Sequence, residues 1–363
     1  MKTTIFIKHF ITFLGASLFS LGVMAQGEPF VKEIQRDFTV NKETSLELVN
    51  KYGNVDILKG NDNNLSIKVI VKINTRDRAR AEEMMKMIQI SVSQEGSIIR
   101  ASTELDEDFG DYFRGVGNQS GSLEINYTVT MPVSVPLNLS NKYGNVFIDE
   151  LLSTSTIDVK YGKLTANKIL HDSNEPLTKI YLSYSNGTLQ DTKWIEMDIK
   201  YSKINITNSK ALVIVSKYSK VYITNGSSVV SESKYDTYDI DKLTNFVTNA
   251  AYGHFEIRNL EKKLQVESKY TDFMVERISA GFESIKVDNS YGTYKLGIDP
   301  AASYQLDSYS KYCSVDYPEN NSSIKYRINE NNEQKINARI GSEQNPKALV
   351  NITSKYGNIR LVP

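Results

Sequence analysis

The sequence predicts an all-β protein, a parallel β-helix or related β-solenoid with coils of ~17 residues, preceded by a small α+β cap. The first observation is a fixed period, since Tyr201, Tyr218, Tyr235 and Tyr252 are equally spaced along the chain. The second is an alternation of apolar and polar residues on both sides of each tyrosine, which is typical of strands with one buried face. Because one such coil cannot bury its own apolar face, the period predicts a stack of coils.

Tyrosines in one register run through most of the chain, usually with Lys before and a small residue after. They are Tyr52, Tyr143, Tyr161, Tyr184, Tyr201, Tyr218, Tyr235, Tyr252, Tyr270, Tyr291, Tyr312 and Tyr356. The unit is too short for a propeller blade, and it lacks the helical periodicity of leucine-rich or ankyrin repeats. We interpret these residues as structural repeat tyrosines.

The register inside each unit predicts which side chains are buried. Before Tyr218, the positions six and four residues earlier are Leu212 and Ile214, and the tyrosine shares their parity. We therefore expect the ring to point inward or to line a corner. After it, the inward positions become Val221 and Ile223, and this slip of one residue requires a bend. The next residue is often Gly, which adopts positive φ without strain, so we expect the bend there.

Residues 1–25 read as a secretory signal peptide. Two lysines precede an apolar run from Ile11 to Met24, and Ala25 ends a small-residue cleavage site. The run is shorter than the roughly 20 residues of a membrane-spanning helix. We expect an exported chain with no transmembrane segment after cleavage, located in the periplasm, on the outer membrane or outside the cell. The alternative is an uncleaved anchor helix.

Residues 26–136 form the predicted N-terminal cap, which includes the first repeat coil at Tyr52. Atypical ends are expected because an open solenoid end is an exposed strand edge. Apolar alternation predicts strands over 65–73 and 123–131, and two strands around the turn 94–97. Thr75 is a candidate N-cap for a short helix whose apolar face holds Ala81, Met84, Met85 and Ile88.

Residues 137–363 form the predicted repeat domain. Its coils follow the order of the tyrosines from Tyr143 to Tyr312, with longer loops at 171–176 and 277–281. The excursion 318–346 contains a predicted hairpin of Ile324–Ile328 and Lys335–Ile340. The final coil runs from Leu349 to Val362.

Two copies of the repeat carry a resemblance to a known family. They read Asn-Lys-Tyr-Gly-Asn-Val-Phe-Ile at 141–148 and Ser-Lys-Tyr-Gly-Asn-Ile-Arg-Leu at 354–361, with the strand Tyr-Thr-Val-Thr-Met-Pro at 127–132. The chain resembles the bacterial "putative adhesin" domains of unknown function, and is similar to head domains of auto-transporter adhesins. The resemblance implies a secreted β-solenoid without catalytic residues. The chain departs from the pattern where Ser replaces the turn glycine at 185, 202 and 219.

Composition limits the classes of partner. Acidic and basic residues balance at 43 each, so nothing indicates nucleic acid or an anionic membrane as a partner. The single cysteine, Cys313, excludes an internal disulfide framework, and we interpret it as a small corner residue. Stability must therefore come from burial and from hydrogen-bonded strand ladders.

Two surface features are candidates for binding. The tyrosines offer either a stacking platform for sugar rings or a structural corner stack, and their parity favours the structural role. The lysines before them should point outward, as a basic stripe for anionic glycans or as one of two opposite charge ladders on a solvated face. Acids two residues earlier, such as Asp198 and Glu232, favour the second interpretation. The weak binding candidates are Lys200, Lys217, Lys234 and Lys269.

No catalytic or metal motif stands out. The acidic stretch 106–111 offers carboxylates for Ca²⁺, but its spacing does not fit an EF-hand loop. His171 and His254 lie far apart in the sequence, without the spacing of metal ligands. We expect no catalytic residues, metal or cofactor.

The sequence therefore predicts an exported, non-enzymatic, adhesin-like envelope or surface protein that binds a surface glycan or an envelope protein over its solenoid face. Two alternatives stay open. A carbohydrate-active β-helix enzyme would place converging acids on one outward face within three neighbouring coils. A self-stacking structural scaffold would associate end to end.

Overall fold

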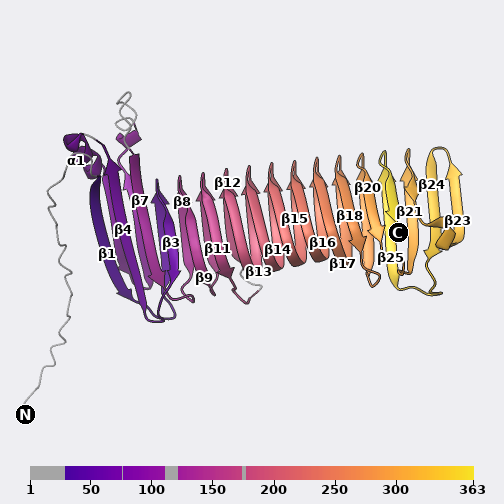
Figure 1. The fold of residues 1–363 in the computed structure, drawn as a ribbon, viewed down its shortest axis with the longest axis horizontal. Coiled ribbons are helices and arrows are strands. Elements are labelled where there is room, and N and C mark those ends of the chain that lie inside the picture. Colours follow the sequence, from indigo (N-terminus) through magenta and orange to yellow (C-terminus); the bar gives the residue numbers. More distant parts are fainter. Residues whose placement is uncertain (1–28, 76, 111–121, 174–176) are drawn as a thin grey trace, which may run out of the picture.

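The computed structural model describes residues 29–75, 77–110, 122–173 and 177–363, so the predicted signal peptide lies outside the described residues. The prediction of an all-β protein is confirmed, because the described chain forms a 26-stranded sheet with one short α-helix. The sheet is mixed. Its central strands pair in parallel, and antiparallel strands occur near both ends. Figure 1 shows the turns of the chain in a row along the long axis of the molecule.

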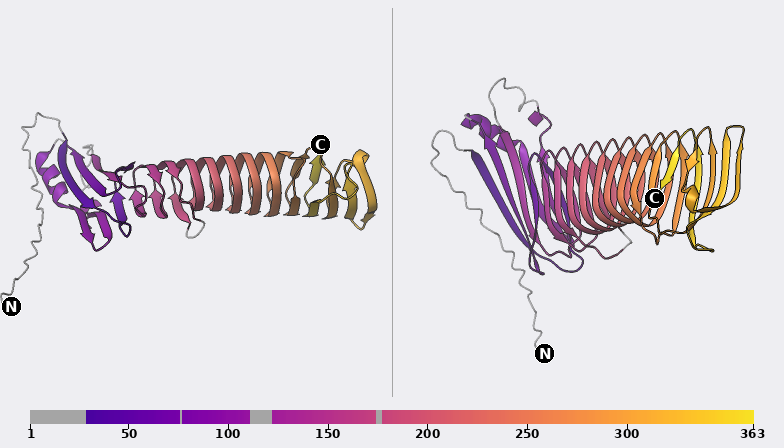
Figure 2. Two further views of the ribbon diagram at one scale, coloured as in Figure 1. Left: turned by 90° about the horizontal axis from the view of Figure 1, so that it is seen from below. Right: turned by 45° about the vertical axis from the view of Figure 1, so that its right-hand side comes forward.

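Five long strands form the middle of the row. They are β13 (Asn186–Lys200), β14 (Lys203–Lys217), β15 (Lys220–Lys234), β16 (Thr237–Ala251) and β17 (His254–Lys269). Each runs from just after one repeat tyrosine to just before the next, and each curves back on itself, as Figure 2 shows. Partners in neighbouring strands stand one repeat period apart in the sequence, for example Lys203 and Lys220. The period in the sequence therefore sets the register of hydrogen bonding between neighbouring strands.

The core lies between the two arms of each coil. Ile214, four residues before a tyrosine, and Ile223, five residues after one, are both buried, which confirms the predicted inward register. A column of buried aromatic rings, made by Tyr238, Phe255 and Phe273, continues along the core with centroid separations of 4.7 and 5.1 Å. Parallel in-register pairing brings equivalent side chains of neighbouring coils together, so the core is also repetitive.

Of the two predicted placements of the repeat tyrosines, the corner is observed and the inward direction is not. These residues are 39–53% exposed, and each has a φ of 50–61°. The left-handed residue at the corner is therefore the tyrosine itself, rather than the residue after it. Because this conformation swings Cβ out of the strand, the ring leaves the face that its parity suggested.

Glycine after the tyrosine serves a different purpose. A Cβ on Gly144 would lie 1.9 Å from the carbonyl oxygen of Gly53 in the adjacent coil. The corners of these coils approach too closely for any side chain to project at this point. In other coils the position holds Ser, whose hydroxyl bonds to backbone; Ser202 Oγ donates to the carbonyl of Lys200 over 2.7 Å.

At the N-terminal end, a long segment of the chain is inserted between two coils that are neighbours in space. The first coil consists of β2 (Ser45–Lys51) and β3 (Val55–Lys59). These strands pair in parallel with β8 (Leu137–Lys142) and β9 (Val146–Leu151), so coils far apart in the sequence are neighbours in space. The intervening residues cover the end. The division of the chain at residue 136 stays a prediction.

The end itself is closed by antiparallel strands and a helix, seen on the indigo side of Figure 1. Strand β4 (Asn64–Asn74) lies between β1 (Phe30–Thr39) and β7 (Ser122–Met131), and β5 (Ile88–Glu95) pairs with β6 (Ile98–Leu105) around the predicted turn. Helix α1 spans Arg78–Lys86, and Ala81 and Met84 are buried as predicted. Its N-cap is Asp77 rather than Thr75, because the Asp77 carboxylate accepts from the backbone N–H of Arg80.

Short strands complete the stack on either side of the long ones. They are β10 (Ser155–Lys160), β11 (Lys163–Ile169), β12 (Thr178–Ser183), β18 (Asp272–Ile278), β19 (Ser284–Ser290), β20 (Tyr294–Ile298), β21 (Tyr304–Lys311), β22 (Val315–Asp316), β25 (Ala348–Lys355) and β26 (Ile359–Val362). A 3₁₀ turn at Glu319–Asn321 precedes the C-terminal hairpin.

The last coils are not in sequence order. Strand β25 pairs in parallel with β19 on one side and with β21 on the other, and β26 likewise joins β20 to β22. The coil of Tyr356 therefore lies between those of Tyr291 and Tyr312. The predicted hairpin is confirmed as β23 (Ser322–Glu330) and β24 (Glu333–Ile340), and β24 pairs antiparallel with β21.

Candidate functional site

The repeat tyrosines form one continuous stack on the outside of the molecule, which we call the tyrosine column. In spatial order it runs Tyr52, Tyr143, Tyr161, Tyr184, Tyr201, Tyr218, Tyr235, Tyr252, Tyr270, Tyr291, Tyr356 and Tyr312. Neighbouring ring centroids are 4.8–5.2 Å apart, and the ring planes differ by at most 16°. The spacing matches that of parallel strands, since each coil contributes one ring.

Backbone pairing holds each tyrosine in its unusual conformation. The N–H of Tyr218 donates to the carbonyl of Lys234 in the next coil over 3.1 Å, and Tyr201 donates to Lys217 over 3.0 Å. A bulky residue at positive φ costs about 1–3 kcal/mol. An aromatic pair contributes about 0.5–1.5 kcal/mol beyond area burial. Because an interior ring has two neighbours, stacking is of the right size to offset the strain.

Stacking also determines which part of each ring is exposed to solvent. Neighbouring rings cover most of both faces of every interior ring, so the surface presents mainly ring edges and hydroxyl groups. The end residues Tyr52 and Tyr312 each have a single ring neighbour in the column. A sugar therefore cannot stack flat on an interior ring, which removes the simplest form of the predicted platform.

The residues before the tyrosines form the lysine row, which points outward as predicted. Its lysines are Lys51, Lys142, Lys160, Lys200, Lys217, Lys234, Lys269, Lys355 and Lys311. Some are paired with acids two residues earlier: Lys200 lies 3.0 Å from Asp198, and Lys160 lies 3.0 Å from Asp158. Their charge is thereby largely neutralised.

Lys217, Lys234 and Lys269 have no ion pair within the described parts of the chain. The ammonium of Lys217 lies 5.3 Å from the ring centroid of Tyr218, and that of Lys234 lies 5.5 Å from the centroid of Tyr235. Both distances are within the range of a cation–π contact. The tyrosine column and the lysine row are therefore one continuous surface here.

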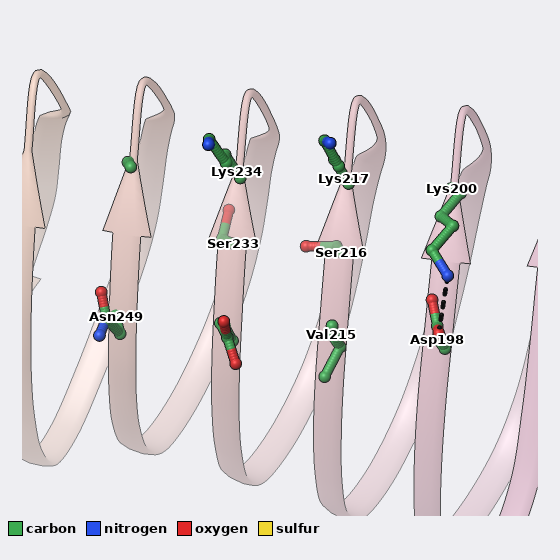
Figure 3. A pocket seen from close by; sticks show the side chains of 10 residues that line it. Asp198, Lys200, Val215, Ser216, Lys217, Ser233, Lys234 and Asn249 are labelled. Atoms are coloured by element: carbon green, nitrogen blue, oxygen red, sulfur yellow. Dashed lines mark hydrogen bonds and ion pairs between the residues drawn. The ribbon is translucent and has the colours of Figure 1, made fainter.

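A hollow of about 270 Å³ lies beside this surface, over the arms of β13 to β16 that precede the tyrosines (Figure 3). Its lining consists of Asp198, Lys200, Val215, Ser216, Lys217, Glu232, Ser233, Lys234, Asn249 and Ala251. In Figure 3 the Lys200 side chain bends to Asp198, whereas Lys217 and Lys234 extend toward the corner of the coil.

The sequence carried a signal for this hollow that the repeat pattern concealed. Val215 and Asn249 stand where Asp198 and Glu232 stand in neighbouring coils, and Ala251 stands where both adjacent coils have Lys. These replacements shorten or neutralise side chains on an outward face. Departures from a repeat therefore mark the site better than the repeat does.

A buried carboxylate supports the corner beneath the hollow. Asp236, which follows a repeat tyrosine, is only 3% exposed. Its Oδ1 accepts from the backbone N–H of Ser219 over 2.7 Å. Its Oδ2 accepts from Ser216 Oγ, Ser233 Oγ and the N–H of Lys234 over 2.7–2.9 Å. Four donors satisfy the charge and tie together the corners that present Lys217 and Lys234.

A cluster of acids around Arg258 lies on the arms of β16 and β17 that follow the repeat tyrosines. The Arg258 guanidinium bonds to Asp239 and Asp241, with 2.8 Å to the former. The hydrogen bond with Asp239 raises the pKa of Arg258, and Glu256 adds to this. The acids are thus held by a permanent cation, in the arrangement of a surface ion-pair cluster.

The remaining candidates have ordinary surroundings. The Nε2 atom of His171 lies 2.9 Å from Thr154 Oγ1, and His254 is an exposed strand residue. Cys313 occupies a corner, with Sγ near the carbonyls of Lys311 and Ser354. The acidic stretch 106–111 extends beyond the described residues. Across the described ranges, no three His, Cys, Asp or Glu residues are grouped to hold a metal ion, and no helix is long and apolar enough to span a membrane.

Comparison with known proteins gives structural similarity only. No protein-family model and no curated protein matches the sequence. Solved structures that match include a putative cell adhesion protein from Clostridium sporogenes, at 14% identity and a TM-score of 0.17, covering 91% of this chain and 99% of that one. A putative adhesin and a putative lipid binding protein, both from Parabacteroides distasonis, match at 7% and 8% identity, with TM-scores of 0.32 and 0.28. Each match covers 91% of this chain and 97% of the other.

Proposed function

We propose that this chain is an exported, non-enzymatic, adhesin-like β-solenoid of the cell envelope or surface. It binds a surface glycan or an envelope protein along the tyrosine column and the lysine row. The observation that carries this proposal is the column itself, a line of exposed aromatic residues that extends along the whole stack.

The corner does not require tyrosine, which supports a role in binding. Gly and Asn adopt positive φ at lower cost than any bulky residue, so either would hold the same turn with less strain. Stacking offsets that strain but leaves ring edges and hydroxyl groups exposed. Tyrosine is enriched in binding surfaces, because it joins an apolar body to a polar tip. The repeat motif's resemblance to adhesin domains points the same way.

A substitution in the column tests the proposal directly. We expect Tyr201→Asn/Tyr218→Asn/Tyr235→Asn to keep the corner, because Asn tolerates positive φ, and to lose at least about tenfold in affinity. Binding of the fluorescently labelled protein to a glycan array and to intact cells would be measured. The control is Tyr222→Ser. Tyr222 lies on β15, outside the tyrosine column, and its ring contacts the ammonium of Lys203. Binding of the triple variant at the wild-type level would contradict the proposal.

Export can be tested in the producing cell. Protease treatment of intact cells, followed by fractionation, should cleave a surface protein and spare a periplasmic one. Cleavage on intact cells supports binding outside the cell. If the protein resists the protease until the outer envelope is opened, it is periplasmic, and its partner must be sought in the periplasm. Recovery of the uncleaved chain in the cytoplasm contradicts export.

A further inference from the structure

Building on the proposed function, we infer that the hollow beside Lys217 and Lys234 is an anion subsite, and that the ligand is a linear acidic polysaccharide lying along the tyrosine column. The inference starts from the difference between these two lysines and Lys200. All three belong to the same row, but only Lys200 has an acid as its ion-pair partner, at 3.0 Å.

The hollow has a small excess of positive charge, because three lysines and only two acids, Asp198 and Glu232, line it. Lys217 and Lys234 are direct partners in the parallel pairing of β14 and β15, so their side chains start about 4.8 Å apart. Like charges placed side by side destabilise each other. An anion between them removes this repulsion. Val215 stands where Asp198 pairs with Lys200 in the neighbouring coil, and Glu232, although it lines the hollow, forms no ion pair with Lys217 or Lys234 among the described residues.

The exposed parts of the column favour the same ligand. Aromatic rings carry a negative face and a positive edge. Because stacking covers the faces, the column presents positive edges and phenol hydroxyl groups, which are donors for oxygen-rich ligands. Neutral sugars that bind aromatic residues by their faces gain little here. Carboxylated sugars gain from both the edges and the ammonium groups.

The geometry favours a polymer over a small anion. The column continues for eleven steps of 4.8–5.2 Å. The turns of the chain that carry it lie in one continuous row (Figure 2). A linear chain can contact several successive rings while one acidic unit lies in the hollow. The Asn249 amide at the edge of the hollow adds a donor and an acceptor for sugar hydroxyl groups.

The test uses polygalacturonate as the acidic probe, with dextran as the neutral one, at about 0.05 M and about 0.5 M salt. We expect Lys217→Gln/Lys234→Gln to weaken polygalacturonate binding about tenfold at the lower salt. Lys200→Gln is the matched control and should change it by no more than about twofold, because Asp198 already neutralises that lysine. Unchanged melting temperatures would show that both variants are folded.

Several outcomes would overturn the inference. They are equal binding of dextran and polygalacturonate, wild-type affinity in the double lysine variant, and equal binding of duplex DNA, which would indicate charge attraction alone. If the tyrosine triple variant loses glycan binding while the lysine variant keeps it, the proposed function stands and the anion subsite falls. If neither variant changes binding, both are wrong.

Discussion

At the scale of single residues, the corners depend on buried polar groups as much as on tyrosines. In three coils the residue after the tyrosine is Ser, and the backbone N–H of one coil donates to the Ser hydroxyl of the next; Ser185 donates to Ser202 over 3.1 Å, and Ser202 to Ser219 over 3.2 Å. Asp236 continues this chain of bonds as a charged member. Burial raises the pKa of its neighbour Tyr238, whose hydroxyl donates to Ser216 Oγ because Ser216 itself donates to Asp236.

Removing the Asp236 carboxylate should destabilise the repeat region. Asp236→Ala leaves buried donors of Ser219 and Lys234 without an acceptor, at about 1–3 kcal/mol for each. We expect a loss of at least about 2 kcal/mol in the free energy of unfolding, measured by denaturant titration. Asp236→Ser should lose less, because Ser already serves at this position in the two preceding coils. Equal losses in the two variants would show that the carboxylate bonds are unimportant.

At the scale of elements, the inward register controls stability. Ile214 on β14 is fully buried between the two arms of its coil. Ile214→Asp places an unpaired charge in an apolar core, so we expect the repeat region to unfold or melt far below the wild type. The control is Val213→Asp, because Val213 is 39% exposed on the outward face. Circular dichroism on heating measures both; a wild-type melting temperature for Ile214→Asp would refute the register.

Much of this architecture could be predicted from the sequence, because strand parity and a fixed period are local signals. The inward positions, the cap strands and the hairpin of β23 and β24 all follow from them. The direction of the tyrosines does not, since bulky residues rarely adopt positive φ and parity assumes an extended chain. The positions of the first and last coils do not follow either. Sequence order does not specify spatial order when an insertion or a returning segment separates two coils.

At the scale of the whole molecule, the two ends discourage self-assembly. Among the described residues, β1, β5, β22 and β23 each pair with a single strand, so all four are edge strands. The edge strands β1 and β23 carry several charged residues, β5 and β22 carry one each, and β23 also has a bulge between Ile324 and Tyr326. Charges and bulges are the usual protection of open edges. These features count against a scaffold that stacks end to end.

We therefore expect a monomer over a wide concentration range in sedimentation velocity. The variant Lys325→Val/Arg327→Val removes the two positive charges of β23 and leaves Ile324, Tyr326 and Ile328, which are 41–46% exposed. It should self-associate as concentration rises. Filaments of the wild-type protein would contradict this expectation and favour the scaffold alternative.

The inserted last coil has a consequence for the timing of folding. Each middle coil docks on the coil that immediately precedes it in the sequence, so the stack can grow as the chain emerges. The coil of Tyr312 is different, because the place beside Tyr291 belongs to the coil of Tyr356. It must wait, with its edge uncovered, until residues up to 362 arrive and pair on both sides. A pause in synthesis before that point leaves the coil of Tyr312 without its neighbour in the stack.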